Sequence, residues 1–151
     1  MTKLFTVMWF DYSSMGITAR EELSFSEIQH LLQVAPQLQQ QLSTYEELNL
    51  PYGATYTCRG GAVIIVEVTH WCWDITQHEL GHIHTGTIIN DTCVLGDEYA
   101  ADQWAIQHGA DIRGLLTSIL RQLDFRIKFD RRWLTMRNRL KLRLDAINKY
   151  S

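Results

Sequence analysis

The sequence has little of what disulfide-bonded scaffolds and membrane proteins are built from. Its three cysteines, Cys58, Cys72 and Cys93, are odd in number and have no paired metal-binding spacing. No disulfide framework is therefore predicted, and a reducing, intracellular setting is expected. No apolar run reaches the length of a membrane span. The first residues lack a strong basic segment and a small-residue cleavage site, so no signal peptide is predicted and a cytoplasmic location is expected.

Repeats, long linkers and low-complexity segments are also missing. The chain of 151 residues, 46% of them apolar and 11% aromatic, fits a single domain with a sizeable core. We divide this domain (1–151) into an N-terminal strand and helices (1–53), a central part (54–109) and C-terminal helices (112–149).

Positive charge is scarce over most of the chain. Residues 1–112 hold three basic side chains against 14 acidic ones, whereas residues 113–151 hold 11 of the 14 basic side chains against three acidic ones. A basic C-terminal segment can bind nucleic acid or a membrane surface. The alternative is a helix whose basic groups face water and the acidic body. Apolar residues that interleave the charges at core-like spacing favour this alternative.

Periodicity and turn residues predict the N-terminal and central elements. Residues 3–10 are expected to form a strand, and Ser24 with Glu27 resembles a capping box for a helix that carries Ile28, Leu31, Leu32 and Ala35 at helical spacing. Another helix is expected after Pro36. Residues 54–58 and 62–68 flank Arg59-Gly60-Gly61, which predicts a hairpin whose second strand is well buried.

Helices are predicted for the rest of the chain. Asp74 and Gln77 resemble a second capping box, which would start a helix at Ile75, and Gly86 would end it. A helix near 96–108 would end at Gly109. Residues 112–149 are expected to be helical, as one helix or as two that are broken near 124–130.

Four of the six histidines lie in "THWCWDITQHELGHIHTG" (69–86). Within it, His78 and His82 are four residues apart, so on a helix they share one face and both imidazoles can reach one metal ion. Glu79 would lie beside the metal, where it can take a proton from a water molecule that the metal activates. His84 falls on the other side of the helix and is expected to be a surface or supporting residue.

The next predicted helix offers a third ligand. Glu98 and Asp102 are also four residues apart and share a face. Glu98 can complete the three protein ligands of a catalytic site, and Asp102 can accept a hydrogen bond from the free ring nitrogen of a ligand histidine. Asp97 is the rival to Glu98, but it has no acidic partner four residues further on.

The pattern His78-Glu79-x-x-His82 followed by Glu98-x-x-Ala101-Asp102 resembles that of the gluzincin zinc metallopeptidases. It is similar to the HtpX-like and CAAX-protease-like branch and to the small soluble ImmA/IrrE-like peptidases, over about residues 54–109. The resemblance implies one Zn²⁺ per chain held by His78, His82 and Glu98, with Glu79 as general base. It also implies an α+β, zincin-like fold: a small antiparallel or mixed sheet, an active-site helix, a glutamate helix and the C-terminal helices. Residues 62–68 would be the edge strand that pairs with an extended substrate.

Two other histidines are candidates for substrate or transition-state contacts. His108 could stabilise an oxyanion, and His70 could lie at the mouth of the site; structural roles, such as capping near Gly109 for His108, are the alternatives. The expected function is zinc-dependent hydrolysis of an intracellular protein or peptide. The alternative is a non-catalytic zinc-containing regulator that binds a protein or nucleic-acid partner through basic C-terminal side chains. In the nucleic-acid version these are Arg137, Arg139, Lys141 and Arg143.

Overall fold

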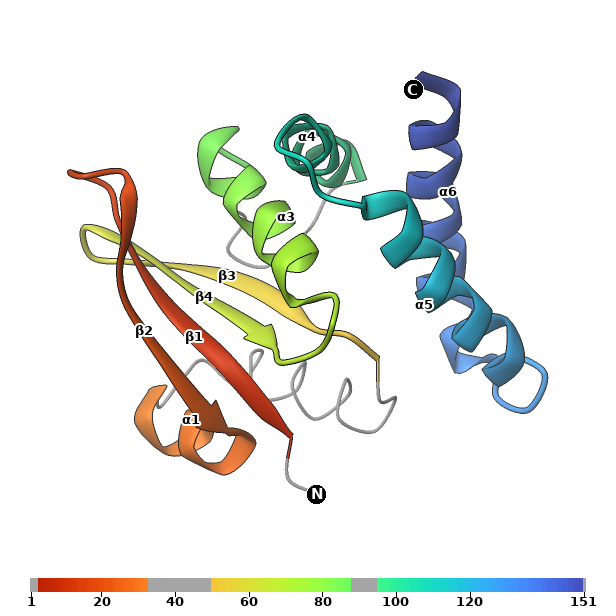
Figure 1. Cartoon of the computed structure of the whole chain (residues 1–151). Helices are drawn as coiled ribbons and strands as arrows, with labels where there is room; N and C mark the ends of the chain where they lie inside the picture. The colour runs from red at the N-terminus through yellow and green to blue at the C-terminus, as the bar shows by residue number, and fades with distance from the viewer. Residues whose placement is uncertain (1–2, 33–49, 88–94, 151) are drawn as a thin grey trace.

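A four-stranded antiparallel sheet forms the base of the molecule (Figure 1). The computed structural model describes residues 3–32, 50–87 and 95–150. The strands are β1 (Leu4–Asp11), β2 (Gly16–Ser24), β3 (Gly53–Cys58) and β4 (Gly61–Glu67), in the spatial order β2-β1-β4-β3. The α+β class is therefore confirmed, as are the strand over 3–10 and the hairpin over 54–68.

The strand order corrects one expectation. β4, which contains most of residues 62–68, pairs with β1 on one side and β3 on the other, so it is a central strand and not the edge. All seven of its residues are buried, as its Val- and Ile-rich composition predicts. The edge strand of this half of the sheet is β3.

The two faces of the sheet are covered by different helices (Figure 1). One face packs on α1 (Phe25–Leu32), and the other packs on α3 (Cys72–His84). Alternate residues of β4 serve the two cores: Ile64 and Val66 pack with α3, and Val63 and Ile65 pack on the α1 side. The capping box of α1 is confirmed, because the Ser24 amide donates to Glu27 Oε1 (3.0 Å) and the Glu27 amide donates to Ser24 Oγ (3.2 Å).

The helix that carries the two histidines starts earlier than expected. α3 begins at Cys72, after a turn in which the Trp71 amide donates to Thr69 Oγ1 (3.1 Å). Asp74 therefore lies inside the first turn and does not cap α3. Its carboxylate accepts the amide of Asp111 (2.8 Å) and so links α3 to the start of α5. Gly86 has the left-handed backbone conformation (φ 69°) predicted for the end of the helix.

Three helices extend the α3 layer away from the sheet. They are α4 (Leu95–Gln107), α5 (Ile112–Arg126) and α6 (Leu134–Tyr150), with a short 3₁₀ helix, η1 (Arg131–Trp133), before α6. α4 is followed by Gly109 at φ 91°, as predicted. The C-terminal region is thus two helices, broken at 127–130. The helix expected after Pro36 lies outside the described residues, and so does Cys93. Within the described ranges, no helix combines the length and apolarity needed to cross a bilayer.

Candidate metal centre

Helices α3 and α4 pack closely enough to bring their polar faces together. Ile75 and Ile83 of α3 face the sheet, whereas Gly81 contacts the backbone of α4. A β-carbon at Gly81 would lie 2.6 Å from the carbonyl oxygen of Ala101, so only glycine permits this approach. The contact places His78 and His82 of α3 opposite Glu98 of α4.

The three predicted ligands lie together, with both histidines buried and Glu98 partly buried. His82 Nε2 is 2.9 Å from Glu98 Oε1, and His78 Nε2 is 3.5 Å from Glu98 Oε2. One donor atom from each residue lies within 4.8 Å of the others. Tetrahedral coordination with bonds of about 2.05 Å requires donor separations of roughly 3.3 Å. Two imidazole nitrogens and a carboxylate oxygen that lie this close together could hold a metal ion.

The outer ring nitrogens of both histidines also have acceptors. His78 Nδ1 is 2.8 Å from Asp102 Oδ1, the partner predicted from the sequence. His82 Nδ1 is 3.2 Å from the carbonyl oxygen of Thr87 and 3.0 Å from its hydroxyl. Because a carboxylate and a carbonyl only accept hydrogen bonds, each Nδ1 is a donor and each Nε2 points to the cluster. Thr87 was missed by the sequence reasoning, although it directly follows the helix-ending Gly86.

A second missed residue comes from the C-terminal helix. Arg143 of α6 donates from Nε to Asp102 Oδ2 (2.9 Å) and from NH2 to Asp102 Oδ1 (2.7 Å). Its NH1 lies 3.3 Å from Glu98 Oε2. The sequence predicts a solvated or ligand-binding surface for the basic segment, whereas Arg143 contacts Asp102 and Glu98 of the cluster.

The charges of the cluster shift its pKa values strongly. Burial lowers the pKa of His78, but hydrogen bonds to Asp102 and Glu98 outweigh it and raise this pKa from 6.5 to about 10. Burial raises the pKa of Glu98. The two histidines and Arg143 outweigh this effect and hold the pKa of Glu98 well below its usual value. Arg143 and His78 likewise lower the pKa of the buried Asp102. A metal ion that binds His78 Nε2 has to displace a proton.

Glu79, the predicted general base, faces β3. It is buried, and its Oε2 accepts a hydrogen bond from the Thr55 hydroxyl at 2.6 Å. Gly53 permits this approach of α3 to the edge strand, because a β-carbon there would lie 2.2 Å from Ile75 Cγ2 and 3.1 Å from Glu79 Oε1. The carboxylate is thus held between α3 and β3.

The structure does not bring the other candidate histidines to the cluster. His70 is exposed and its ring lies 4.9 Å from that of Trp71. His108 is exposed, and its Nδ1 lies 2.7 Å from the Trp104 carbonyl oxygen. It is ten residues after Glu98, which corresponds to about 15 Å along the helix axis. The capping role therefore describes His108 better than an oxyanion contact. His84 is also exposed, and its ring stacks on Trp104 at 4.7 Å.

Comparison of the chain with protein-family models, with curated proteins and with solved structures finds no match in any of the three. The function is therefore inferred from the arrangement of the site. A group of two buried histidines and a partly buried glutamate could hold a metal ion, and the buried carboxylate of Glu79 directly follows the first histidine in the chain.

Proposed function

We propose that the chain is a zinc-dependent metallopeptidase of the zincin type. His78, His82 and Glu98 hold the ion, and Glu79 is the general base. The observation that carries this proposal is the buried carboxylate of Glu79, which lies on the helix that presents both histidines and is fixed against an edge strand. A purely structural zinc site is usually closed by four protein ligands, whereas this group has three in the described part of the chain.

Each residue has a defined task in peptide hydrolysis. A bound zinc ion supplies Lewis acidity, which polarises a peptide carbonyl and acidifies a water molecule. Thr55 holds Oε2 of Glu79, so Oε1 is the oxygen that accepts a proton from the attacking water and passes it to the leaving amine. Asp102 and Thr87 keep His78 and His82 in the tautomer that ligates through Nε2.

The substrate is an extended segment of an intracellular protein or peptide. Among the described strands, β3 ends the sheet on the side of Glu79. A peptide that lies along β3 would bring its backbone carbonyl groups past Glu79. This assigns to β3 the role that sequence analysis gave to residues 62–68.

The test combines zinc content with hydrolysis of an unfolded protein such as casein. We expect about one zinc per chain in the wild type, a large loss of zinc in Glu98→Ala, and retained zinc in Glu79→Gln. The Glu79→Gln variant should lose about 10²–10⁴-fold in turnover because it cannot accept the proton. Glu22→Gln, the same change at an exposed position of β2, is the matched control. Full activity of Glu79→Gln would refute the assigned base, and a zinc-free wild type would refute the metal centre.

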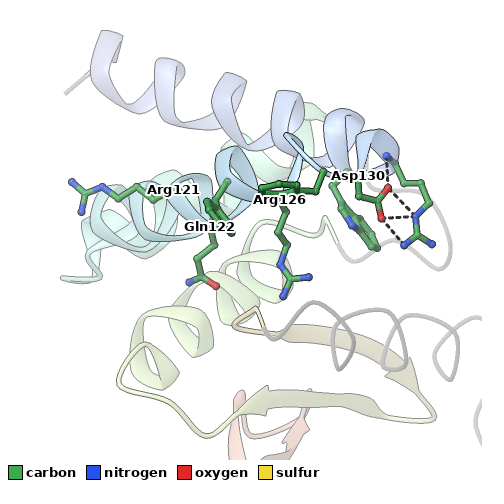
Figure 2. A pocket seen from close by; sticks show the side chains of 8 residues that line it. Arg121, Gln122, Arg126 and Asp130 are labelled. Carbon is green, nitrogen blue, oxygen red and sulfur yellow. Dashed lines mark hydrogen bonds and ion pairs between the residues drawn. The ribbon is translucent and has the colours of Figure 1, made fainter.

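A second candidate function is the binding of an acidic partner at the turn between α5 and α6. The observation that favours it is a cavity of about 620 Å³ lined by aromatic and basic side chains (Figure 2). Phe125 and Phe129 there are 62% and 80% exposed. Arg121 and Arg126 make no ion pair among the described residues, whereas Asp130 is held by Arg132. Figure 2 shows Gln122 and Arg126 projecting from the same side of α5.

This candidate predicts binding that weakens as salt is added. An acidic peptide with an aromatic anchor and a single-stranded oligonucleotide are the two probes. Arg121→Gln/Arg126→Gln should weaken binding, whereas Arg139→Gln, exposed on α6, should not. Arg143 is unsuitable for this test, because its side chain contacts the metal cluster. If neither probe binds at low salt, this candidate function is wrong.

A further inference from the structure

Arg143 differs from its neighbours on the basic C-terminal helix. Its side chain is only 12% exposed, whereas Arg139 and Lys141 are exposed. The apolar face of α6, through Leu140, Leu144 and Ile147, packs on the core. This packing fixes the direction from which the arginine reaches across to α4, so its guanidinium is held in place before any ligand binds.

The guanidinium contacts both carboxylates of the cluster. Two of its nitrogens form the paired contact with Asp102, and the third lies beside Glu98. Asp102 is 1% exposed, and its Oδ1 lies close to both Arg143 NH2 and His78 Nδ1. A planar, permanently charged fork suits this paired contact, and a lysine ammonium would reach fewer of these oxygens at once.

The contact with Glu98 gives the two oxygens of that carboxylate different partners. Oε2 lies near Arg143 NH1, while Oε1 lies near His82 Nε2. A carboxylate with one oxygen held by a guanidinium keeps the other for a metal ion. Without the guanidinium, both oxygens could turn to the ion, or the side chain could rotate away from it.

We propose that Arg143 is a positioning residue of the metal centre, which couples the C-terminal helix to zinc binding by orienting Glu98 and Asp102. This inference rests on the proposed metal centre. Arg143 does not touch the ion; it restricts Glu98 to ligation through one oxygen and keeps Asp102 in place as the acceptor for His78. The final helix is therefore a part of the zinc site, although the signature residues all lie before position 103.

The role differs from simple attachment of α6 to the body of the molecule. If Arg143 only anchored the helix, its loss would lower stability and leave the affinity of the folded chain for zinc unchanged. Leu140→Ala is the matched variant for that case, because it weakens the packing of α6 and leaves the guanidinium contacts intact. Arg139→Gln controls for the loss of one positive charge on the same helix.

The experiment measures zinc dissociation constants by competition with a chromophoric chelator, beside the thermal midpoint of each zinc-free variant. We expect Arg143→Gln to bind zinc about 10- to 100-fold more weakly than the wild type, as for other residues that support metal ligands. Arg143→Lys should fall between the two, and Arg139→Gln and Leu140→Ala should stay within about twofold of the wild type. The visible spectrum of the Co²⁺-loaded protein should also change in Arg143→Gln, because the coordination by Glu98 changes.

The outcomes separate the two proposals. If the wild type binds zinc and Arg143→Gln binds it equally well with the same Co²⁺ spectrum, the role of Arg143 is overturned and the metal centre stands. If Leu140→Ala loses as much zinc affinity as Arg143→Gln, Arg143 acts only as an anchor for α6. If the wild type binds no zinc, the metal centre itself is overturned. Should Arg143→Gln fail to fold, Arg143→Lys decides the question by the same measurements.

Discussion

Gly81 lies where α3 comes closest to α4, and alanine at this position tests how strictly the metal centre depends on the spacing of the two helices. The added β-carbon would lie 2.6 Å from the carbonyl oxygen and 3.0 Å from the α-carbon of Ala101. Ordinary contact begins at 3.4 Å. Because the obstacle is backbone and cannot rotate away, we expect the helices to separate by roughly 0.8 Å.

Two opposing effects set the cost of Gly81→Ala. Overpacking costs about 1–3 kcal/mol, and alanine in place of glycine inside a helix returns about 1 kcal/mol. The net destabilisation is therefore up to about 2 kcal/mol, or a fall of about 4–8 °C in the thermal midpoint. The separation also moves His78 and His82 from Glu98. Metal sites require ligand distances within about 0.2 Å, so we expect zinc affinity to fall at least about tenfold.

The assay is thermal unfolding of the zinc-free protein together with a zinc titration. Gly96→Ala is the control, because it is also in a helix and an added β-carbon there meets nothing within 4 Å. That variant should be as stable as the wild type or more stable by up to about 1 kcal/mol, with zinc affinity unchanged. If Gly81→Ala matches Gly96→Ala in both measurements, the reasoning from helix spacing is wrong.

Three further predictions concern pH, capping and metal removal. Burial raises the pKa of Glu67 above its usual 4.5 despite Lys3 at 3.7 Å, so stability is lost as pH rises through the raised pKa. Glu67→Gln should therefore raise the thermal midpoint at neutral pH and lose this advantage in acid; a pH-independent difference would contradict this. Asp111 caps α5 by accepting a hydrogen bond from the Gly114 amide at 2.9 Å. Asp111→Ala should therefore lower the free energy of unfolding in urea by about 1 kcal/mol. An effect no larger than that of Asp145→Ala would contradict the capping role. Chelation should lower the midpoint of the zinc-loaded wild type and leave that of Glu98→Ala unchanged.

The features predicted correctly from the sequence depend on short-range patterns. Residues three or four apart share a helix face, so the spacing predicted two pairs, His78 with His82 and Glu98 with Asp102. Whether the group binds zinc stays a prediction. Glycine at a left-handed position ends α3, which is also a local signal. The α+β class, which the resemblance to the gluzincins implies, is also confirmed.

The features that were missed or wrong depend on contacts between distant segments. Strand β2 was not predicted because six of its nine residues are exposed and only Leu23 is buried, so no alternation of apolar and polar residues marks it. The prediction that β4 is an edge strand was wrong, because a buried apolar run does not reveal how many neighbouring strands a strand has. Asp74 has the spacing of a cap, yet its partner is Asp111, 37 residues away. Arg143 and Arg139 look alike in a basic run, and only the packing of α6 distinguishes them.

The stacked rings between α3 and α4 give the molecule an optical property. The indole of Trp104, on α4, stacks on His84 from α3 at 4.7 Å and on His108 at 3.7 Å. Any change in the spacing of α3 and α4 alters the contact between Trp104 and His84, and with it the surroundings of a single fluorophore. In a chain that keeps Trp104 as its one tryptophan, intrinsic emission would follow the geometry of the two ligand-bearing helices in real time, without a label.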